Sequence, residues 1–162
     1  MAEFEIVGAR GTIQDPKELV RRLQSLKEGQ ALALNADLVC GTEHIEIAVR
    51  HALRSFRRGT NSCNTIMMET LLFASGERQI SKAQEKMSPS QGEARVAFVL
   101  FGASAHEALR TSQLERDDSV LACSDEKARR FGIGEKELEA VGDGKAQDLV
   151  LERVAFVEIA KR

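Results

Sequence analysis

The chain has 162 residues, 43% of them apolar, which is enough to bury the core of one domain. Charged residues make up 30% but nearly cancel to a net charge of -2, which excludes the overall basicity of a histone-like protein and confines any nucleic-acid contact to a local patch. The sequence has no apolar run that approaches the roughly 18 residues of a membrane span. Cys40, Cys63 and Cys123 are odd in number and far apart in sequence, which predicts reduced thiols, small core residues and a cytoplasmic protein.

Periodicity and turn residues predict elements that alternate along the first part of the chain. We predict, in order, a strand over residues 4–7, a helix from Pro16 with Asp15 as its N-cap and Gly29 as its stop, a strand over residues 31–34, and a long helix from Thr42 to Gly59.

The second part of the chain begins with the most apolar helix. We predict this core helix from an Asn64 cap to Gly76, then a helix over residues 79–87, a buried strand over residues 96–101, short helices over residues 105–111, 125–131 and 135–141, and a last helix over residues 146–160. No linker or repeat interrupts the series. The predicted fold class is therefore α/β (α+β): a compact single domain, residues 1–162, with a small buried sheet packed with several helices.

The histidines do not form a metal or catalytic motif. His44 and His51 lie seven residues apart on one helix, roughly 10 Å at ~1.5 Å per residue, which is too far for a shared zinc ion. Ser104 precedes His106 by two residues but is better placed as a helix cap than as a nucleophile. We therefore predict no catalytic residue, metal, cofactor or small-molecule substrate.

Basic residues gather between residues 41 and 90, where seven Lys or Arg face five Asp or Glu. One group, at helical spacing on the long helix, consists of Arg50, Arg54, Arg57 and Arg58. The other, at steps of four, consists of Arg78, Lys82 and Lys86. A solvated helix face and an anion- or RNA-binding surface both fit this pattern.

Several segments together resemble one family, the small kinase-binding subunit of the KEOPS (EKC) complex, also called the PRPK-binding protein family, in its short archaeal form. The most recognisable stretch is 66–80, IMMETLLFASGERQI, preceded by 35–44, NADLVCGTEH, and followed by the strand VAFVLFG at 96–102 and LVLERVA at 149–155. Order, spacing and total length agree over nearly the whole chain.

The resemblance implies a non-catalytic subunit of the complex that makes threonylcarbamoyl-adenosine in tRNA. Such a subunit has a compact α/β fold, docks on and stimulates the small atypical kinase of the complex, and helps to capture tRNA through its 3′ CCA end. The matched segment supports an RNA contact only at residues 77–80. Adding the neighbouring basic and amide side chains, we expect RNA-binding residues at Arg54, Arg57, Arg58, Asn61, Asn64, Arg78, Gln79, Lys82 and Lys86.

The last helix, over residues 146–160, has more apolar residues than one packed face requires, which predicts a hydrophobic kinase-docking face in the C-terminal third. We assign it to Ile133, Leu138 and Val141. Two alternatives stay open: a purely protein-binding adaptor with a solvated basic stripe, and a small enzyme in which His44 or His106 meets a cysteine or carboxylate in a deep pocket.

Overall fold

The structure is a computed structural model that describes residues 4–161 and has an α+β fold, as predicted. It divides into two compact units, each built from two separate stretches of chain. Residues 4–37 and 88–121 contain the sheet, and residues 38–87 and 122–161 are helical. The short 3-10 helix η1 (Ala36–Leu38) lies where the chain first passes from the sheet unit to the helical unit.

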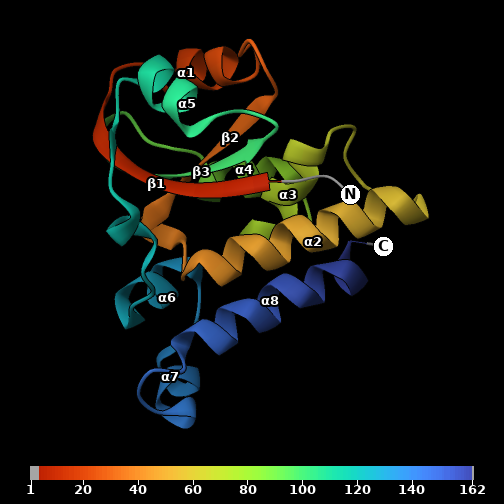
Figure 1. Ribbon diagram of the computed structural model, residues 1–162. Coiled ribbons are helices and arrows are strands. Elements are labelled where there is room, and N and C mark those ends of the chain that lie inside the picture. The colour runs from red at the N-terminus through yellow and green to blue at the C-terminus, as the bar shows by residue number, and fades with distance from the viewer. Residues whose placement is uncertain (1–3, 162) are drawn as a thin grey trace. The chain divides into compact units, whose positions relative to one another are not determined.

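The sheet unit contains an antiparallel sheet in the order β2-β3-β1-β4. Its strands are β1 (Phe4–Ile13), β2 (Gln30–Asn35), β3 (Gly92–Phe101) and β4 (Glu115–Arg116). The helices α1 (Pro16–Leu23) and α5 (Ala105–Ser112) lie together over one face of the sheet, and the 3-10 helix η2 (Asp118–Leu121) follows β4 (Figure 1). The central strand β3 is buried from Val96 to Leu100, as its continuous apolar run predicts.

Two glycines of this unit allow close backbone contacts and do not end the elements before them. β1 continues through Gly8, where a Cβ atom would lie 2.5 Å from the Asp117 carbonyl oxygen and the backbone N–H instead donates to the Asp118 carboxylate at 2.9 Å. Helix α1 ends at Leu23 with Gln24 as its C-cap, before the predicted stop. Gly29 (φ 70°) instead serves a close approach of two backbone segments, since a Cβ there would collide with the Phe101 carbonyl oxygen.

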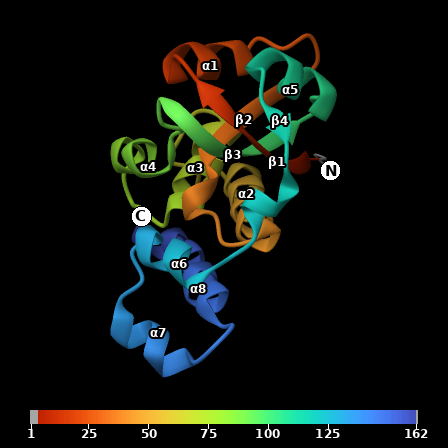
Figure 2. The ribbon, with the colours of Figure 1, turned by 90° about the vertical axis from the view of Figure 1, so that its left-hand side faces the viewer.

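The helical unit is built around α2 (Thr42–Arg58) and α3 (Ile66–Ser75). The other helices are α4 (Ile80–Met87), α6 (Asp125–Phe131), α7 (Glu135–Val141) and α8 (Ala146–Ala160). Helix α3 is buried along almost its whole length, as predicted, but it is capped by Thr65 and not by Asn64. Helices α2 and α8 run side by side in the same direction (Figure 1), and α6 and α7 lie near the start of α8 (Figure 2).

The prediction that all cysteines are reduced is wrong for two of them. Cys40, just before α2, forms a disulfide with Cys123, just before α6, and Cys63 is free. The two positions are 83 residues apart, so their sequence distance gave no indication that the fold brings them together. The backbone around Cys40 is also held by side chains, since Lys127 donates to the Val39 carbonyl oxygen at 3.0 Å and Gln147 donates to the Cys40 carbonyl oxygen at 2.9 Å. Cysteine usage therefore no longer supports a reducing compartment.

His44 connects this junction with the end of α3. Its Nδ1 accepts a hydrogen bond from the Cys40 N–H at 3.0 Å, so Nε2 carries the proton and donates to the Ala74 carbonyl oxygen at 2.8 Å. The ring also meets Phe131 edge-on, with the centroids 5.3 Å apart. Both nitrogens are satisfied only in the neutral imidazole, and burial lowers the pKa of His44 to about 4.

The unfolded chain takes up a proton on His44 near pH 6.5 and the folded chain does not, so stability is present above pH 6.5 and is lost as the pH falls toward 4. The loss from this group is roughly 3 kcal/mol, at about 1.4 kcal/mol per pKa unit. Urea unfolding between pH 7 and pH 4.5 measures it. His44→Gln should flatten the profile and His51→Gln should retain most of it; an unchanged slope in His44→Gln would contradict the assignment.

Candidate functional site

The first group of predicted RNA-binding residues surrounds the loop 59–65 between α2 and α3. Arg57 and Arg58 are exposed in the last turn of α2, and Arg54 is half-buried one turn earlier. Asn64 is exposed, whereas Asn61 donates its side-chain N–H to the Cys63 carbonyl oxygen at 2.9 Å. Arginines at a helix C-terminus complement the partial negative charge there, so these side chains also favour the helix.

The second group lies past the other end of α3. Arg78 and Gln79 are exposed in the turn before α4, and Lys82 is exposed on α4. The ten residues of α3 separate this turn from the loop 59–65 by roughly 15 Å at ~1.5 Å per residue. The two groups are therefore not a single cluster around the loop, and a polyanion that contacts both Arg58 and Arg78 must span about that distance.

Lys86 is a correction to the predicted stripe. Its ammonium donates to the Ser75 carbonyl oxygen at 2.7 Å, lies 3.6 Å from the Glu77 carboxylate and sits 3.8 Å from the Phe131 ring centroid. Desolvation lowers its pKa, although Glu77 opposes that effect. The four-residue spacing predicted three equivalent cations, but Lys86 caps the end of α3 and leaves Arg78 and Lys82 as the exposed ones.

Replacing Lys86 by Met should therefore cost stability, roughly 1–2 kcal/mol, because the Ser75 carbonyl loses its donor and the ring loses its cation. Lys82→Met, on the exposed side of the same helix, should stay within about 0.5 kcal/mol of the unmodified protein. Urea unfolding of the two variants at neutral pH makes the comparison. Equal stability would place Lys86 back among the solvated cations.

A buried ion pair lies beneath the loop 59–65. The side chains of Glu69 and Lys161 are 0% and 2% exposed, and Glu69 Oε2 lies 2.5 Å from Lys161 Nζ. The other carboxylate oxygen, Oε1, accepts the backbone N–H groups of Ser62 and Cys63, each at 3.0 Å. The ammonium also donates to the Ser55 hydroxyl and the Thr60 carbonyl oxygen, each at 3.0 Å. This group, named the Glu69 clamp here, joins α2, the loop, α3 and the end of α8.

The predicted kinase-docking residues are core residues, and that prediction is wrong about their exposure. Ile133 and Leu138 are 3% and 8% exposed, in a cluster with Phe131, Leu149 and Val150. Val141 is partly buried against the same cluster. Two short helices need an apolar face to pack on α8, and sequence periodicity does not distinguish that face from a surface that binds another protein.

The exposed apolar surface lies on α8 itself. Its packed side carries Leu149, Val150, Val154 and Val157, all buried. Phe156 and Ile159 lie on another side and are 59% and 67% exposed; they are the large apolar residues exposed between positions 4 and 161. With Glu152, Arg153 and Ala155 they line a shallow hollow. Three residues apart on a helix, the two side chains are neighbours on one face.

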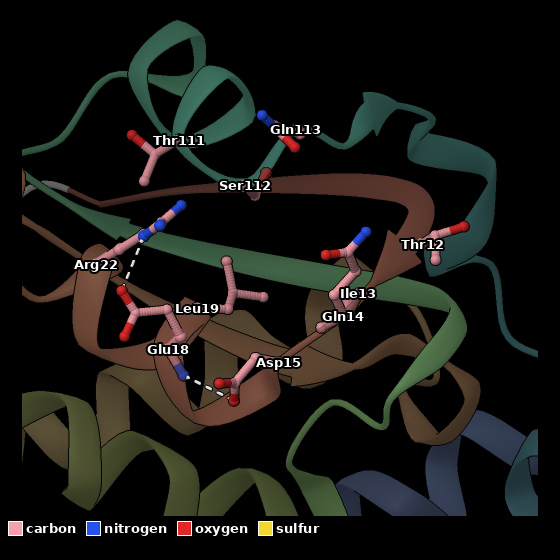
Figure 3. Close-up of a pocket in the computed structure, with 10 residues that line it drawn as sticks. All are labelled: Thr12, Ile13, Gln14, Asp15, Glu18, Leu19, Arg22, Thr111, Ser112 and Gln113. Carbon is pink, nitrogen blue, oxygen red and sulfur yellow. Dashed lines mark hydrogen bonds and ion pairs between the residues drawn. The ribbon is translucent and has the colours of Figure 1, made fainter.

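A second hollow lies in the sheet unit, between the start of α1 and the end of α5 (Figure 3). It measures about 170 Å³, and its lining carries carboxylates, hydroxyls and amides but no imidazole or thiol. Asp15 caps α1 by accepting the Glu18 N–H at 3.2 Å, and Glu18 pairs with Arg22 at 3.1 Å. Hydrogen bonds from Arg21 and Arg22 hold the pKa of Glu18 at about 2. The two carboxylates are thus already engaged within α1.

The two candidate catalytic histidines have different surroundings. His44 is buried and bound to backbone groups, and His106 is exposed on α5. Within residues 4–161, no three side chains of His, Cys, Asp or Glu come together as a metal site. In the same range, no helix combines the length and the apolar character required to cross a bilayer.

An α+β protein that exposes an arginine-rich helix end, a polar loop and an apolar helix face has the features of a partner-binding protein. A comparison with family models agrees: the model described as "Kinase binding protein CGI-121" matches residues 11–156. The chain therefore belongs to the CGI-121 family of kinase-binding proteins. The Regulatory protein Cgi121 of the archaeon Methanocaldococcus jannaschii is 29% identical over 139 residues, which cover 79% of this chain and 83% of that protein.

Glu69 and Lys161 are not among the predicted RNA-binding or kinase-docking residues, although the sequence carries a signal for their pairing. Glu69 is the one charged residue within the apolar run 66–75, and a carboxylate in a helix that must be buried requires a cationic partner. The partner, Lys161, is 92 residues away and could not be chosen among the many lysines and arginines without the fold.

Proposed function

We propose that the chain is the kinase-binding regulatory subunit of a KEOPS-type tRNA-modification complex and binds its partner kinase through α8. The observation that carries this proposal is the exposed Phe156–Ile159 pair in a chain of the CGI-121 family. The partner is the small atypical kinase of the complex, and the other subunits associate through it. The resemblance of residues 66–80 and 35–44 to the subunit of that complex supports the choice of kinase.

The face on α8 has the composition of an interface centre. Phe156 supplies a large apolar surface with few rotatable bonds, and Ile159 extends it along the helix. Glu152 and Arg153 border the pair, and the Arg153 guanidinium is held by Glu137 at 2.8 Å. Apolar side chains with a polar border are typical of surfaces that a partner covers.

Phe156→Glu and Ile159→Glu should each weaken binding to the purified kinase by at least about 30-fold, because a charge then replaces an apolar anchor that becomes desolvated in the complex. Both variants should unfold at the urea concentration of the unmodified protein, since the side chains are exposed. Isothermal titration calorimetry measures the binding.

Ala140→Glu adds the same charge at an exposed position of α7 and should bind the kinase normally. Ile133→Glu should instead destabilise the fold by roughly 3 kcal/mol or more, because it buries an unpaired charge. If Phe156→Glu and Ile159→Glu both bind the kinase with unchanged affinity, the docking face is elsewhere.

We also propose that the protein helps to recruit tRNA through its single-stranded 3′ CCA end. Exposed cations at Arg57, Arg58, Arg78 and Lys82 support an anion-binding role, and the amides of Asn64 and Gln79 are exposed beside them. The competing function is a kinase adaptor without RNA contact. It is favoured by the engagement of Lys86, which removes one cation from the stripe, and by the absence of Trp and Tyr for base stacking.

Arg78→Glu combined with Lys82→Glu should weaken tRNA binding strongly and reduce the slope of log affinity against log salt by about 1.4, at ~0.7 per phosphate contact on a single strand. Lys17→Glu combined with Lys136→Glu changes the net charge equally at two other exposed positions and should leave both quantities nearly unchanged. Fluorescence anisotropy with intact tRNA and with tRNA lacking its CCA end is the measurement. Equal affinity of the unmodified protein for both RNAs, or no binding, would favour the adaptor.

In this proposal the chain is not itself an enzyme and acts in the cytoplasm, where the tRNA is modified by another subunit. The description of its archaeal relative as a regulatory protein supports a role in controlling a partner. The polar hollow of the sheet unit, His44 and His106 have no part in the proposed function.

A further inference from the structure

We propose that the Glu69 clamp couples the two binding activities, so that docking of the kinase on α8 orders the loop 59–65 and strengthens RNA binding. The inference rests on the proposed function, because it assigns a regulatory role to a contact between the two proposed surfaces. It starts from a single side chain, Lys161, which follows directly on the helix that carries Phe156 and Ile159.

Lys161 is the C-cap of α8, and its N–H donates to the Val157 carbonyl oxygen at 2.9 Å. The ammonium has three donors, and it has three acceptors, each on a different element: the Ser55 hydroxyl of α2, the Thr60 carbonyl of the loop and the Glu69 carboxylate of α3. It also lies 4.9 Å from the Phe73 ring centroid. In the structure, the last turn of α8 is therefore held by contacts to the loop and its two flanking helices.

The loop depends on the same contact. Its N–H groups at Ser62 and Cys63 point to the carboxylate of Glu69, and its carbonyl at Thr60 accepts from Lys161. When Lys161 leaves, Thr60 loses its donor, and Glu69 becomes a buried carboxylate without its cation. The geometry of the loop, and with it the directions of Asn61 and Asn64, thus changes with the state of α8.

The last turn of a helix is the part most prone to fray, because its final carbonyls lack partners within the helix. Coupling requires a second, frayed state of this turn in which these three hydrogen bonds are broken, beside the docked state of the structure in which the buried ammonium makes them. Ile159 belongs to this turn, so a kinase that packs on Phe156 and Ile159 binds the docked state preferentially. A kinase that stabilises the docked state also strengthens the binding of an RNA that requires this state. By thermodynamic linkage, the RNA strengthens kinase binding by the same factor.

The test is a binding cycle with the full chain, the purified kinase and tRNA. In the unmodified protein, saturating kinase should increase tRNA affinity by about twofold or more, a factor bounded by the reciprocal of the docked fraction of the free protein, and saturating tRNA should increase kinase affinity by the same factor. In Glu69→Gln combined with Lys161→Met, both factors should fall to about one. The double variant removes both buried charges, and the side-chain amide oxygen introduced at position 69 still accepts the Ser62 and Cys63 N–H groups. Lys136→Met, an exposed lysine of α7, is the control and should retain the coupling.

Hydrogen exchange provides a readout that does not require RNA. The Ser62 and Cys63 amides should exchange more slowly when the kinase is bound to the unmodified protein, and their exchange should not change with kinase in the double variant. If kinase and tRNA both bind but neither alters the affinity of the other, or if the amides are unaffected by kinase, the inference is wrong and the proposed function stands. If the unmodified protein binds neither partner, the proposed function itself is wrong.

Discussion

The helical unit depends on one buried ion pair, Glu69 with Lys161. A carboxylate and an ammonium removed from water are each costly, and their attraction compensates only when all remaining hydrogen-bonding groups are satisfied. Here they are: the carboxylate accepts two backbone N–H groups as well as the ammonium, and the ammonium makes three hydrogen bonds. A pair of this kind tolerates little displacement. The end of α2, the loop 59–65 and the start of α3 are therefore positioned by contacts with the residue that follows α8.

The opposite end of α2 is held in a different way. There, neutral His44 is hydrogen-bonded to the backbone on both sides, the Cys40–Cys123 disulfide joins the starts of α2 and α6, and Gln147 at the start of α8 donates to the Cys40 carbonyl oxygen. Because α2 and α8 run in the same direction, they are joined at both ends (Figure 1). The neutral and covalent contacts at one end are insensitive to salt, whereas the surface cations at the other end respond to it.

Local chemistry made most of the fold predictable, and tertiary contacts decided the rest. Bounds of α6, α7 and α8 follow from helical periodicity and the glycines between them, and the Asp15 and Ser104 caps follow from their side chains. Lys86, Ile133 and Leu138 were assigned to surfaces because periodicity shows which residues share a face but not what covers it. The disulfide and the Glu69 clamp join residues 83 and 92 positions apart, and no local pattern encodes such a pairing. The sequence predicts an excess of apolar residues on the last helix. Only the packed structure shows that, of the large ones, Phe156 and Ile159 are exposed.

Each unit is made of two stretches of chain that are interrupted by part of the other unit, which has a consequence for synthesis on the ribosome. The sheet cannot be completed before β3 and β4 emerge, by which time α2, α3 and α4 have already been made. Glu69 in turn waits for a cation that is translated 92 residues later. During that interval the apolar helix α3 carries an unneutralised carboxylate and has no complete core to enter. Nascent chains should accordingly stay accessible to chaperones and proteases until α8 is released, and neither unit is obtainable as one continuous fragment.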